Sequence, residues 1–285
     1  CRNTFKVSCK TGDLRRVTNT TRLVSFAKQE ELKGHIDPLS HLKNRRVYMY
    51  RGTKDKRYQK NHGVDSVGLV EDFFAFFSSN PGSYLHFEDS LPSTHVWPTK
   101  NYGPKCGTAS HEAIEACGYD GAKQCLKHAH GADRIRNSGV PFKESSLHEF
   151  DQRPFFGRSW PGLADTGFVY VPEECATGTL KCGLHLALHG CGVDHYFHKA
   201  VRHLGFNEIA EANQLIILWP RMKPNDGNDP ASKRHFRGTF NTRLGCWDSW
   251  GETGYDFAAK SGLQMAALWR MIRSLHTKNP NKSTQ

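Results

Sequence analysis

The chain has 285 residues and a formal net charge of +11, and 37% of its residues are hydrophobic. This composition is that of a folded protein and excludes a disordered chain, while the length favours one large domain over two small ones. No run of about 18 apolar residues is present, so we expect no transmembrane helix and no membrane partner. The Lys and Arg residues are dispersed, which favours a solvated basic surface over a nucleic-acid or heparin site.

The first half of the chain predicts two strands with a helix between them. Residues 45–50 have the composition of a strand and lead into a turn, and residues 64–77 carry apolar side chains at helical spacing. A second short strand is expected at 84–87, and the loop after it holds His95. Two glycines interrupt residues 113–128, for which we expect a loop and then a short helix.

The second half begins with residues 131–165, which are rich in glycine, proline and charge and are expected to form a long surface excursion. Strands and helices then alternate, which favours an α/β fold with a mostly parallel sheet. The expected segments are strands at 167–172, 184–188 and 215–219, helices at 206–213 and 257–275, and a polar loop at 225–245.

The nine cysteines predict disulfides. Three pairs are close in sequence and flanked by turn-forming residues, and a longer pair would leave Cys125 unpaired; the pairs are Cys1 with Cys9, Cys106 with Cys117, Cys175 with Cys182, and Cys191 with Cys246. Disulfides form in oxidising compartments, so we expect a secreted, extracellular protein. A zinc site is the alternative, but no Cys-x2-Cys knuckle is present and we expect no metal.

Asp55 and His95 are candidate partners in nucleophilic catalysis. In serine esterases a histidine takes the proton of the serine, and a carboxylate holds that histidine in the productive tautomer. Asp55 follows the first predicted strand and His95 follows the next, so both loops leave the carboxyl ends of neighbouring strands. The alternative is that Asp55 is only a turn residue, because a chain with 16 His and 28 acidic residues contains such pairs by chance.

The segment 184–191, Leu-His-Leu-Ala-Leu-His-Gly-Cys, is a more specific signal. Its leucines alternate with His and Ala, which gives a strand with one apolar face. Gly190 after this strand allows a backbone N–H to turn toward a developing oxyanion. His189 could instead serve only to hydrogen-bond the turn. A metal site made of this and nearby histidines is disfavoured, because no zincin helix motif is present.

The nucleophile itself has no candidate, since Gly-x-Ser-x-Gly occurs nowhere in the chain. That motif forms the strained turn that presents the serine in α/β-hydrolases.

Several stretches in chain order carry a family resemblance: residues 1–9, 47–55 (VYMYRGTKD), 94–99 (THVWPT), 106–107, 117–122 (CGYDGA), 167–172, 184–191 (LHLALHGC), 206–208, 216–220, 245–248 (GCWD) and 261–267. They resemble the extracellular single-domain poly(3-hydroxybutyrate) depolymerases in their circularly permuted form. The resemblance implies a circularly permuted α/β-hydrolase-like fold and a secreted monomer. It also implies hydrolysis of short hydroxyacid polyesters without a cofactor.

The resemblance also implies roles for individual residues. Asp55 would be the triad acid and His95 the general base. The backbone N–H of Cys191, next to Gly190, would be an oxyanion donor, with Cys191 bridged to Cys246. Trp247 would line the substrate crevice, for which a large rigid apolar ring is suited, although plain core packing is the alternative.

The order of the motifs bears on the absent serine. In an unpermuted hydrolase the oxyanion strand precedes the nucleophile, the acid and the histidine, whereas here it follows the acid and the histidine. In the permuted family the nucleophile elbow precedes the position that matches Cys1. We therefore expect residues 1–285 to form one catalytic domain that is N-terminally incomplete and lacks the nucleophile strand and helix. The alternative is a secreted, catalytically dead hydrolase-like protein that binds a polymer or a protein partner.

Overall fold

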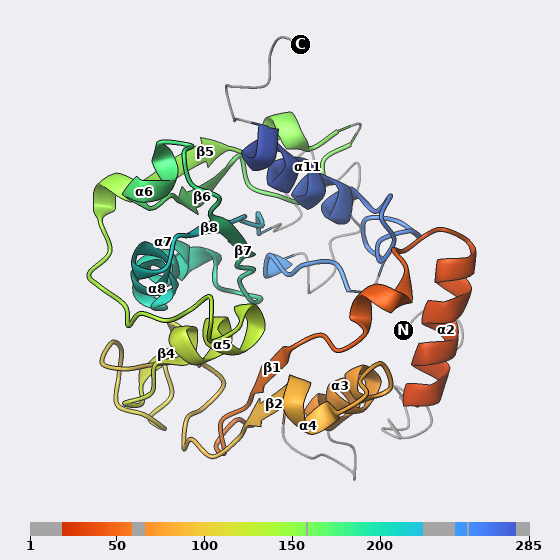
Figure 1. Ribbon diagram of the computed structural model, residues 1–285, viewed down its shortest axis with the longest axis horizontal. Coiled ribbons are helices and arrows are strands. Elements are labelled where there is room, and N and C mark those ends of the chain that lie inside the picture. The colour runs from red at the N-terminus through yellow and green to blue at the C-terminus, as the bar shows by residue number, and fades with distance from the viewer. Residues whose placement is uncertain (1–18, 59–65, 158, 225–242, 250, 278–285) are drawn as a thin grey trace. The chain divides into compact units, whose positions relative to one another are not determined.

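The computed structural model describes residues 19–58, 66–157, 159–224, 243–249 and 251–277. The chain divides into two compact units, Cys1–Arg134 and Ile135–Gln285 (Figure 1). The expectation of a single catalytic domain over residues 1–285 stays a prediction. Among the described residues, no helix has the length and apolar character needed to cross a membrane.

The first unit contains two pairs of short parallel strands and the helices around them. β1 pairs with β2, and β3 pairs with β4. In chain order its elements are α2 (Thr20–Leu32), the 3-10 helix η2 (Leu39–Leu42), β1 (Val47–Tyr50), α3 (Ser66–Ala75), α4 (Pro81–Tyr84), β2 (Leu85–Glu88), β3 (Trp97–Thr99), β4 (Ile114–Ala116) and α5 (Gly121–His130).

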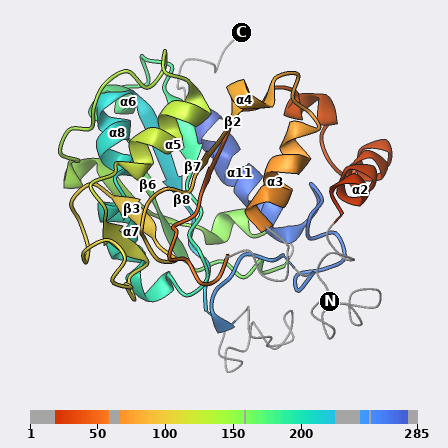
Figure 2. The same ribbon diagram turned by 90° about the horizontal axis from the view of Figure 1, so that it is seen from below.

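Local sequence signals explain several of these boundaries. The predicted strand, helix and strand at 45–50, 64–77 and 84–87 are confirmed by β1, α3 and β2. The predicted short helix is α5, whose first turn is capped by the Asp120 carboxylate accepting the Lys123 N–H at 3.0 Å. α5 packs against β1 and β3, and α2 lies beside α3 (Figures 1 and 2). β4 lies where only a loop was expected, because a strand of three residues carries almost no periodicity.

The second unit is built on one four-stranded sheet in the order β5-β6-β8-β7. β6 runs antiparallel to β5 and to β8, and β7 runs parallel to β8. In chain order its elements are η3 (Glu144–Ser146), β5 (Leu147–Asp151), η4 (Arg153–Phe155), β6 (Thr166–Tyr170), α6 (Glu173–Ala176), β7 (Gly183–Leu186), η5 (Asp194–Tyr196), α7 (Phe197–His203), α8 (Phe206–Ala212), β8 (Leu215–Trp219) and α11 (Leu263–Thr277).

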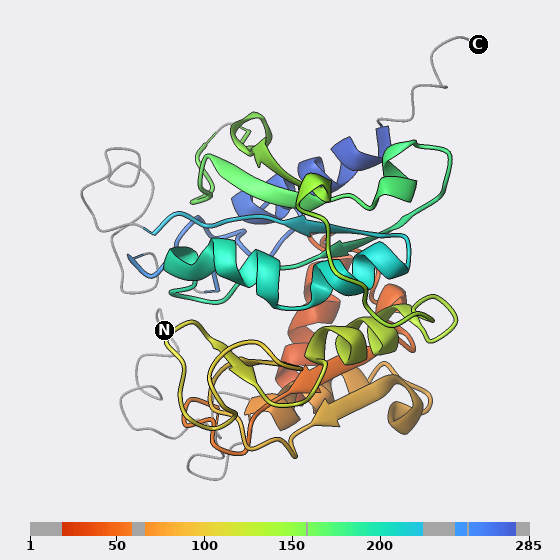
Figure 3. The same cartoon turned by 90° about the vertical axis from the view of Figure 1, so that its left-hand side faces the viewer.

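Helices cover both faces of this sheet (Figure 3). On one side α11 packs onto β6 and β8 in a core whose members are all less than 10% exposed: Leu163, Val169, Leu218, Met222, Ala267, Leu268 and Met271. On the other side α8 packs on β8, where the Phe206 and Trp219 rings meet edge to face at 5.6 Å. Burying each large apolar side chain contributes roughly 1.5–3 kcal/mol, so packing on the two faces of the sheet stabilises the unit.

Three expectations for the second unit need correction. The excursion at 131–165 contains β5, which pairs with β6, so that part of the prediction is wrong. The helix expected at 257–275 begins only at Leu263, because short turns that end in the Gly262 N–H bond to Ala259 precede it. The sheet of this unit is mixed, since β6 opposes both its neighbours. Most of the polar loop expected at 225–245 lies outside the described residues.

Candidate active site

The first unit places Asp55 and His95 in the loops that follow β1 and β2. Three backbone hydrogen bonds continue the pairing beyond the strands: Arg51 N–H to Glu88 O (3.0 Å), Thr53 N–H to Leu91 O (2.8 Å) and Lys54 N–H to Ser93 O (3.1 Å). The two loops therefore leave the sheet side by side. This parallel arrangement is what brings the two side chains together.

The Asp55 carboxylate and the His95 ring are joined by a hydrogen bond of 2.9 Å between Oδ2 and Nδ1. Asp55 is buried, at 4% exposure, whereas 47% of the His95 side chain is exposed. In a neutral imidazole this contact places the proton on Nδ1, which donates to the carboxylate. Nε2 is then the proton acceptor, as general-base chemistry requires.

The other oxygen of Asp55 is held by the backbone. Oδ1 accepts the N–H groups of Arg57 at 2.7 Å and Tyr58 at 3.2 Å. Burial raises the pKa of this carboxyl, but the hydrogen bonds from His95, Arg57 and Tyr58 outweigh burial and hold the Asp55 pKa below its ordinary value. Asp55 is therefore ionised at neutral pH and fixed in orientation.

Close approach of the two loops depends on Gly52. A Cβ at Gly52 would overlap the carbonyl oxygen and the hydroxyl of Ser93. Ser93 is fully buried, and its hydroxyl is hydrogen-bonded to the hydroxyl of Tyr50. The Tyr58 ring lies 5.2 Å from the His95 ring, so the imidazole is also packed on one side.

Glu115 is a buried carboxylate that no sequence pattern singled out. It lies on β4 with no exposed surface. Oε1 accepts the Thr94 hydroxyl at 2.6 Å, while Oε2 accepts the N–H groups of Gly107 at 2.6 Å and Thr94 at 3.3 Å. Thr94 directly precedes His95, so the hydrogen bonds of Glu115 hold the histidine loop in place. Its strand is too short for a pattern to show that it is buried.

Glu115 also lies close to two cysteines, but the group is unsuited to a metal. Within the described residues, the carboxylate and the sulfurs of Cys106 and Cys117 lie within 4.8 Å of one another. The two sulfurs form a disulfide, whereas a metal would need thiolates. The glutamate oxygens are already committed to the histidine loop.

The second unit holds the His189–Gly190–Cys191 segment just beyond β7. His189 is buried, its Nδ1–H donates to the Gly190 carbonyl at 2.8 Å, and its Nε2 accepts the Met222 N–H at 2.9 Å. Burial lowers the pKa of His189, which keeps the ring neutral. His189 therefore has the role in hydrogen-bonding the turn that the sequence offered as its alternative. Gly190 and Cys191 are exposed, so the backbone after the strand is presented to solvent on a rigid base.

No family model matches this chain. A poly(3-hydroxybutyrate) depolymerase of Delftia acidovorans is 30% identical over 257 residues, which is 89% of this chain and 47% of that protein. A polyhydroxybutyrate depolymerase of Talaromyces funiculosus is 27% identical over 280 residues, covering 96% of this chain and 77% of that protein.

Two solved structures are similar over most of the chain. One is a PHB depolymerase with a serine replaced by alanine, complexed with an R3HB trimer (TM-score 0.69, 27% identity, 84% of this chain and 73% of that chain). The other is a PHB depolymerase from Penicillium funiculosum (TM-score 0.70, 26% identity, 87% of this chain and 76% of that chain).

The chain is similar over most of its length to poly(3-hydroxybutyrate) depolymerases. It spans about half the length of the Delftia depolymerase, 47%, and 77% of the Talaromyces depolymerase.

The described cysteines form three disulfides: Cys106–Cys117, Cys175–Cys182 and Cys191–Cys246. These are three of the four predicted pairs, and the fourth, Cys1 with Cys9, lies outside the described residues. Cys125 carries a free thiol whose pKa burial raises to about 11. It is therefore a structural side chain and a poor nucleophile.

Trp247 is half-buried and follows the disulfide that joins Cys191 to Cys246. Its indole Nε1–H donates to the His189 carbonyl at 3.0 Å, and the ring packs against the core under α11. The disulfide and this hydrogen bond both tie the segment 246–247 to the segment 189–191. Trp247 thus has a packing role in this unit.

Proposed function

We propose that this chain carries the acid and the histidine of a serine esterase that hydrolyses polyesters of short hydroxy acids. The observation that carries the proposal is the 2.9 Å contact between Asp55 Oδ2 and His95 Nδ1 in loops that leave two parallel strands. The family and the names of its curated members support the substrate class.

In the proposed mechanism His95 Nε2 accepts the proton of the serine hydroxyl as the oxygen attacks the ester carbonyl. The same proton passes to the leaving alkoxide when the tetrahedral intermediate collapses to an acyl-enzyme, and water then repeats the sequence. Asp55 stays ionised and stabilises the imidazolium that forms on His95. The low pKa of Asp55 and its backbone hydrogen bonds suit it to that role.

We propose that the backbone N–H of Cys191, next to Gly190, stabilises the oxyanion. Support comes from the exposed turn after β7 and from the three restraints on it, namely the buried His189, the Cys191–Cys246 disulfide and the Trp247 hydrogen bond. A rigid donor is what electrostatic stabilisation of a transition state needs. We assign Trp247 to the wall of the substrate crevice by the same resemblance.

The nucleophile is proposed to lie outside these 285 residues, since they contain no Gly-x-Ser-x-Gly. The strands before Asp55 and His95 precede β7 and the His189–Gly190–Cys191 segment in the chain, which supports a circularly permuted α/β-hydrolase. The three disulfides support an extracellular location. We further propose a monomer that acts without cofactor, metal, nucleic acid or membrane.

The test uses the complete protein, meaning the product of the full coding sequence. We expect release of hydroxy acid from a 3-hydroxybutyrate trimer and covalent labelling by a fluorophosphonate probe, both lost in His95→Gln. The control is His41→Gln, a histidine of the first unit remote in sequence from both loops. A complete protein that labels and turns over equally well after His95→Gln refutes the assignment.

A second candidate function is a secreted, catalytically dead hydrolase-like protein that binds a polymer or a protein. The absence of a serine motif from the 285 residues favours it. A complete protein that binds polyester, is inert to the fluorophosphonate probe and releases no acid would establish this alternative.

A further inference from the structure

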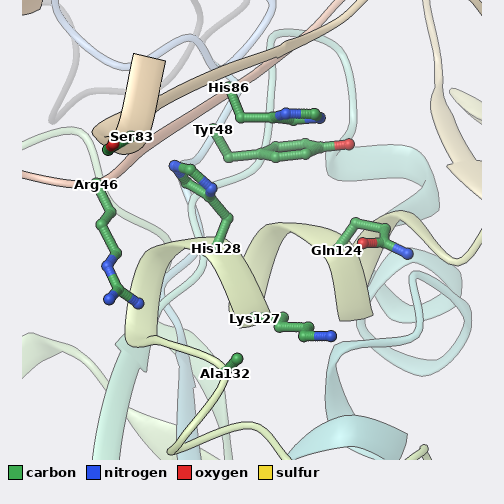
Figure 4. Close-up of a pocket in the computed structure, with 8 residues that line it drawn as sticks. All are labelled: Arg46, Tyr48, Ser83, His86, Gln124, Lys127, His128 and Ala132. Carbon is green, nitrogen blue, oxygen red and sulfur yellow. The ribbon is translucent and has the colours of Figure 1, made fainter. Parts of the chain in front are cut away.

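A pocket of about 310 Å³ lies at the end of the β1–β2 pair opposite to Asp55 and His95 (Figure 4). Arg46 directly precedes β1, and His86 lies near the start of β2. Lys127 and His128 come from the last turns of α5. Because Asp55 and His95 follow the carboxyl ends of the same strands, this pocket is distinct from the candidate active site.

The lining is cationic. Arg46 and Lys127 are exposed, and in the described part of the chain neither makes an ion pair. None of the eight lining residues is acidic. The Asp133 carboxylate and the Arg46 guanidinium both lie beside Gly131, because a Cβ on that glycine would meet both groups. The carboxylate offsets part of the Arg46 charge and leaves that of Lys127.

One wall of the pocket is aromatic and fixed. The rings of Tyr48 and His86 are stacked at 5.3 Å with an interplanar angle of 20°, and the His128 ring lies 5.8 Å from His86 (Figure 4). His128 Nε2–H donates to the Tyr84 carbonyl at 2.7 Å, and the Tyr48 hydroxyl is hydrogen-bonded to that of Tyr119 at 2.7 Å. The rings are therefore held in place before any ligand arrives.

A purely structural explanation covers only part of the positive charge. Lys127 and His128 lie in the last turn of α5, where cations stabilise the helix dipole. Arg46 directly precedes β1 and His86 lies on β2, so neither gains from that dipole. Arg46 and His86 nevertheless line the same pocket as Lys127, and this convergence is the observation that points to a ligand.

We propose that this pocket binds a small molecule through an oxyanion, either a carboxylate or a phosphate. A guanidinium offers paired N–H donors to two oxygens of such a group, and an ammonium adds a second positive charge. The volume is at the lower end of that of small-molecule sites. The exposed face of His86 in the Tyr48 stack suits the uncharged part of the ligand.

The test is an NMR titration of the folded chain with sodium phosphate and, separately, with sodium 3-hydroxybutyrate, at ionic strength held constant with NaCl. Binding is read without turnover, so the result does not depend on the proposed esterase. We expect saturable shifts at Tyr48, His86 and Lys127. Response to phosphate alone assigns a phosphate ligand, and response to 3-hydroxybutyrate assigns a carboxylate.

The matched variants separate the pocket from general charge. Arg46→Gln with Lys127→Gln is expected to weaken binding about tenfold or more, because two charged hydrogen-bond donors are lost. Lys43→Gln with Arg45→Gln removes the same charge just outside the lining and should leave the affinity within about twofold. Equal weakening in both double variants overturns the proposal, as does the absence of saturable shifts with either anion.

Discussion

The Asp55–His95 pair carries the first prediction at the scale of single residues. Asp55→Asn keeps the shape of the side chain but presents the wrong hydrogen-bonding partner to Nδ1. In the complete protein we expect kcat for 3-hydroxybutyrate trimer to fall about 10³- to 10⁴-fold with little change in KM. Steady-state kinetics check this. Asp89→Asn, whose side chain is 55% exposed beside the same loops, should leave kcat unchanged.

The lowered pKa of Asp55 gives a prediction about stability. A carboxyl with a folded pKa below its unfolded value of about 4 stabilises the fold above that pH, and this contribution is lost as the pH falls through the folded pKa. Urea denaturation of the 285-residue chain should show Asp55→Asn less stable than wild type at pH 7. The difference should shrink toward pH 2. A gap of the same size at both values of pH would contradict the assignment.

Glu115 carries a prediction that separates positioning from chemistry. Glu115→Gln keeps the volume but turns an amide toward N–H donors, so one donor of Thr94 or Gly107 loses its acceptor. We expect a loss of about 1–3 kcal/mol in the free energy of unfolding. In the complete protein kcat should fall while KM and fluorophosphonate labelling of the serine persist. The exposed Glu149→Gln removes the same charge and should change neither quantity.

At the scale of elements, the β1–β2 loops depend on a close approach of backbones. Gly52→Ala would push the turn away from Ser93 and move Asp55 relative to His95. Misplacement of about 1 Å costs roughly 10²-fold in rate, so we expect kcat to fall by about that factor in the complete protein. Gly82→Ala is the matched control, because its Cβ would meet only Asn80 Oδ1 at 3.9 Å. It should be neutral in both kinetics and stability.

The elements that the sequence predicted are those with enough length for a pattern. The alternation of 184–188 and the apolar run of 215–219 predicted β7 and β8, while the spacing in 64–77 predicted α3. β4 and β5 were not predicted, because β4 has only three residues and the burial of side chains along β5 alternates weakly. The start of α11 was placed too early, because the apolar residues at 257–259 continue the helical pattern through a turn.

The part of the candidate site that could be predicted consists of the residues that follow predicted strands. Asp55 and His95 follow two predicted neighbouring strands, which made their contact an expectation, but the order of elements alone left open that Asp55 is only a turn residue. Glu115 and Ser93 could not be predicted, because their role arises from burial against loops far away in sequence. The need for glycine at position 52 also becomes apparent only from the structure, where Ser93 fills the space that a Cβ would take. Contacts between two loops produce no periodic pattern in the sequence from which they could be predicted.

At the scale of the whole molecule, the disulfides distribute stability unevenly, and their loop lengths predict by how much. Cys191–Cys246 closes 55 residues and Cys175–Cys182 closes 7. Cross-linking a longer loop removes more entropy from the unfolded chain, about 4 kcal/mol for the first and about 2 kcal/mol for the second. Replacing each pair by serines should therefore lower the free energy of unfolding more for Cys191–Cys246, measured in urea without reductant. The Cys191–Cys246 variant should also free the turn after β7, visible as faster hydrogen exchange at the Gly192 amide, which bonds to Leu244 O. Equal losses for the two pairs would show that loop entropy is not what these bridges contribute.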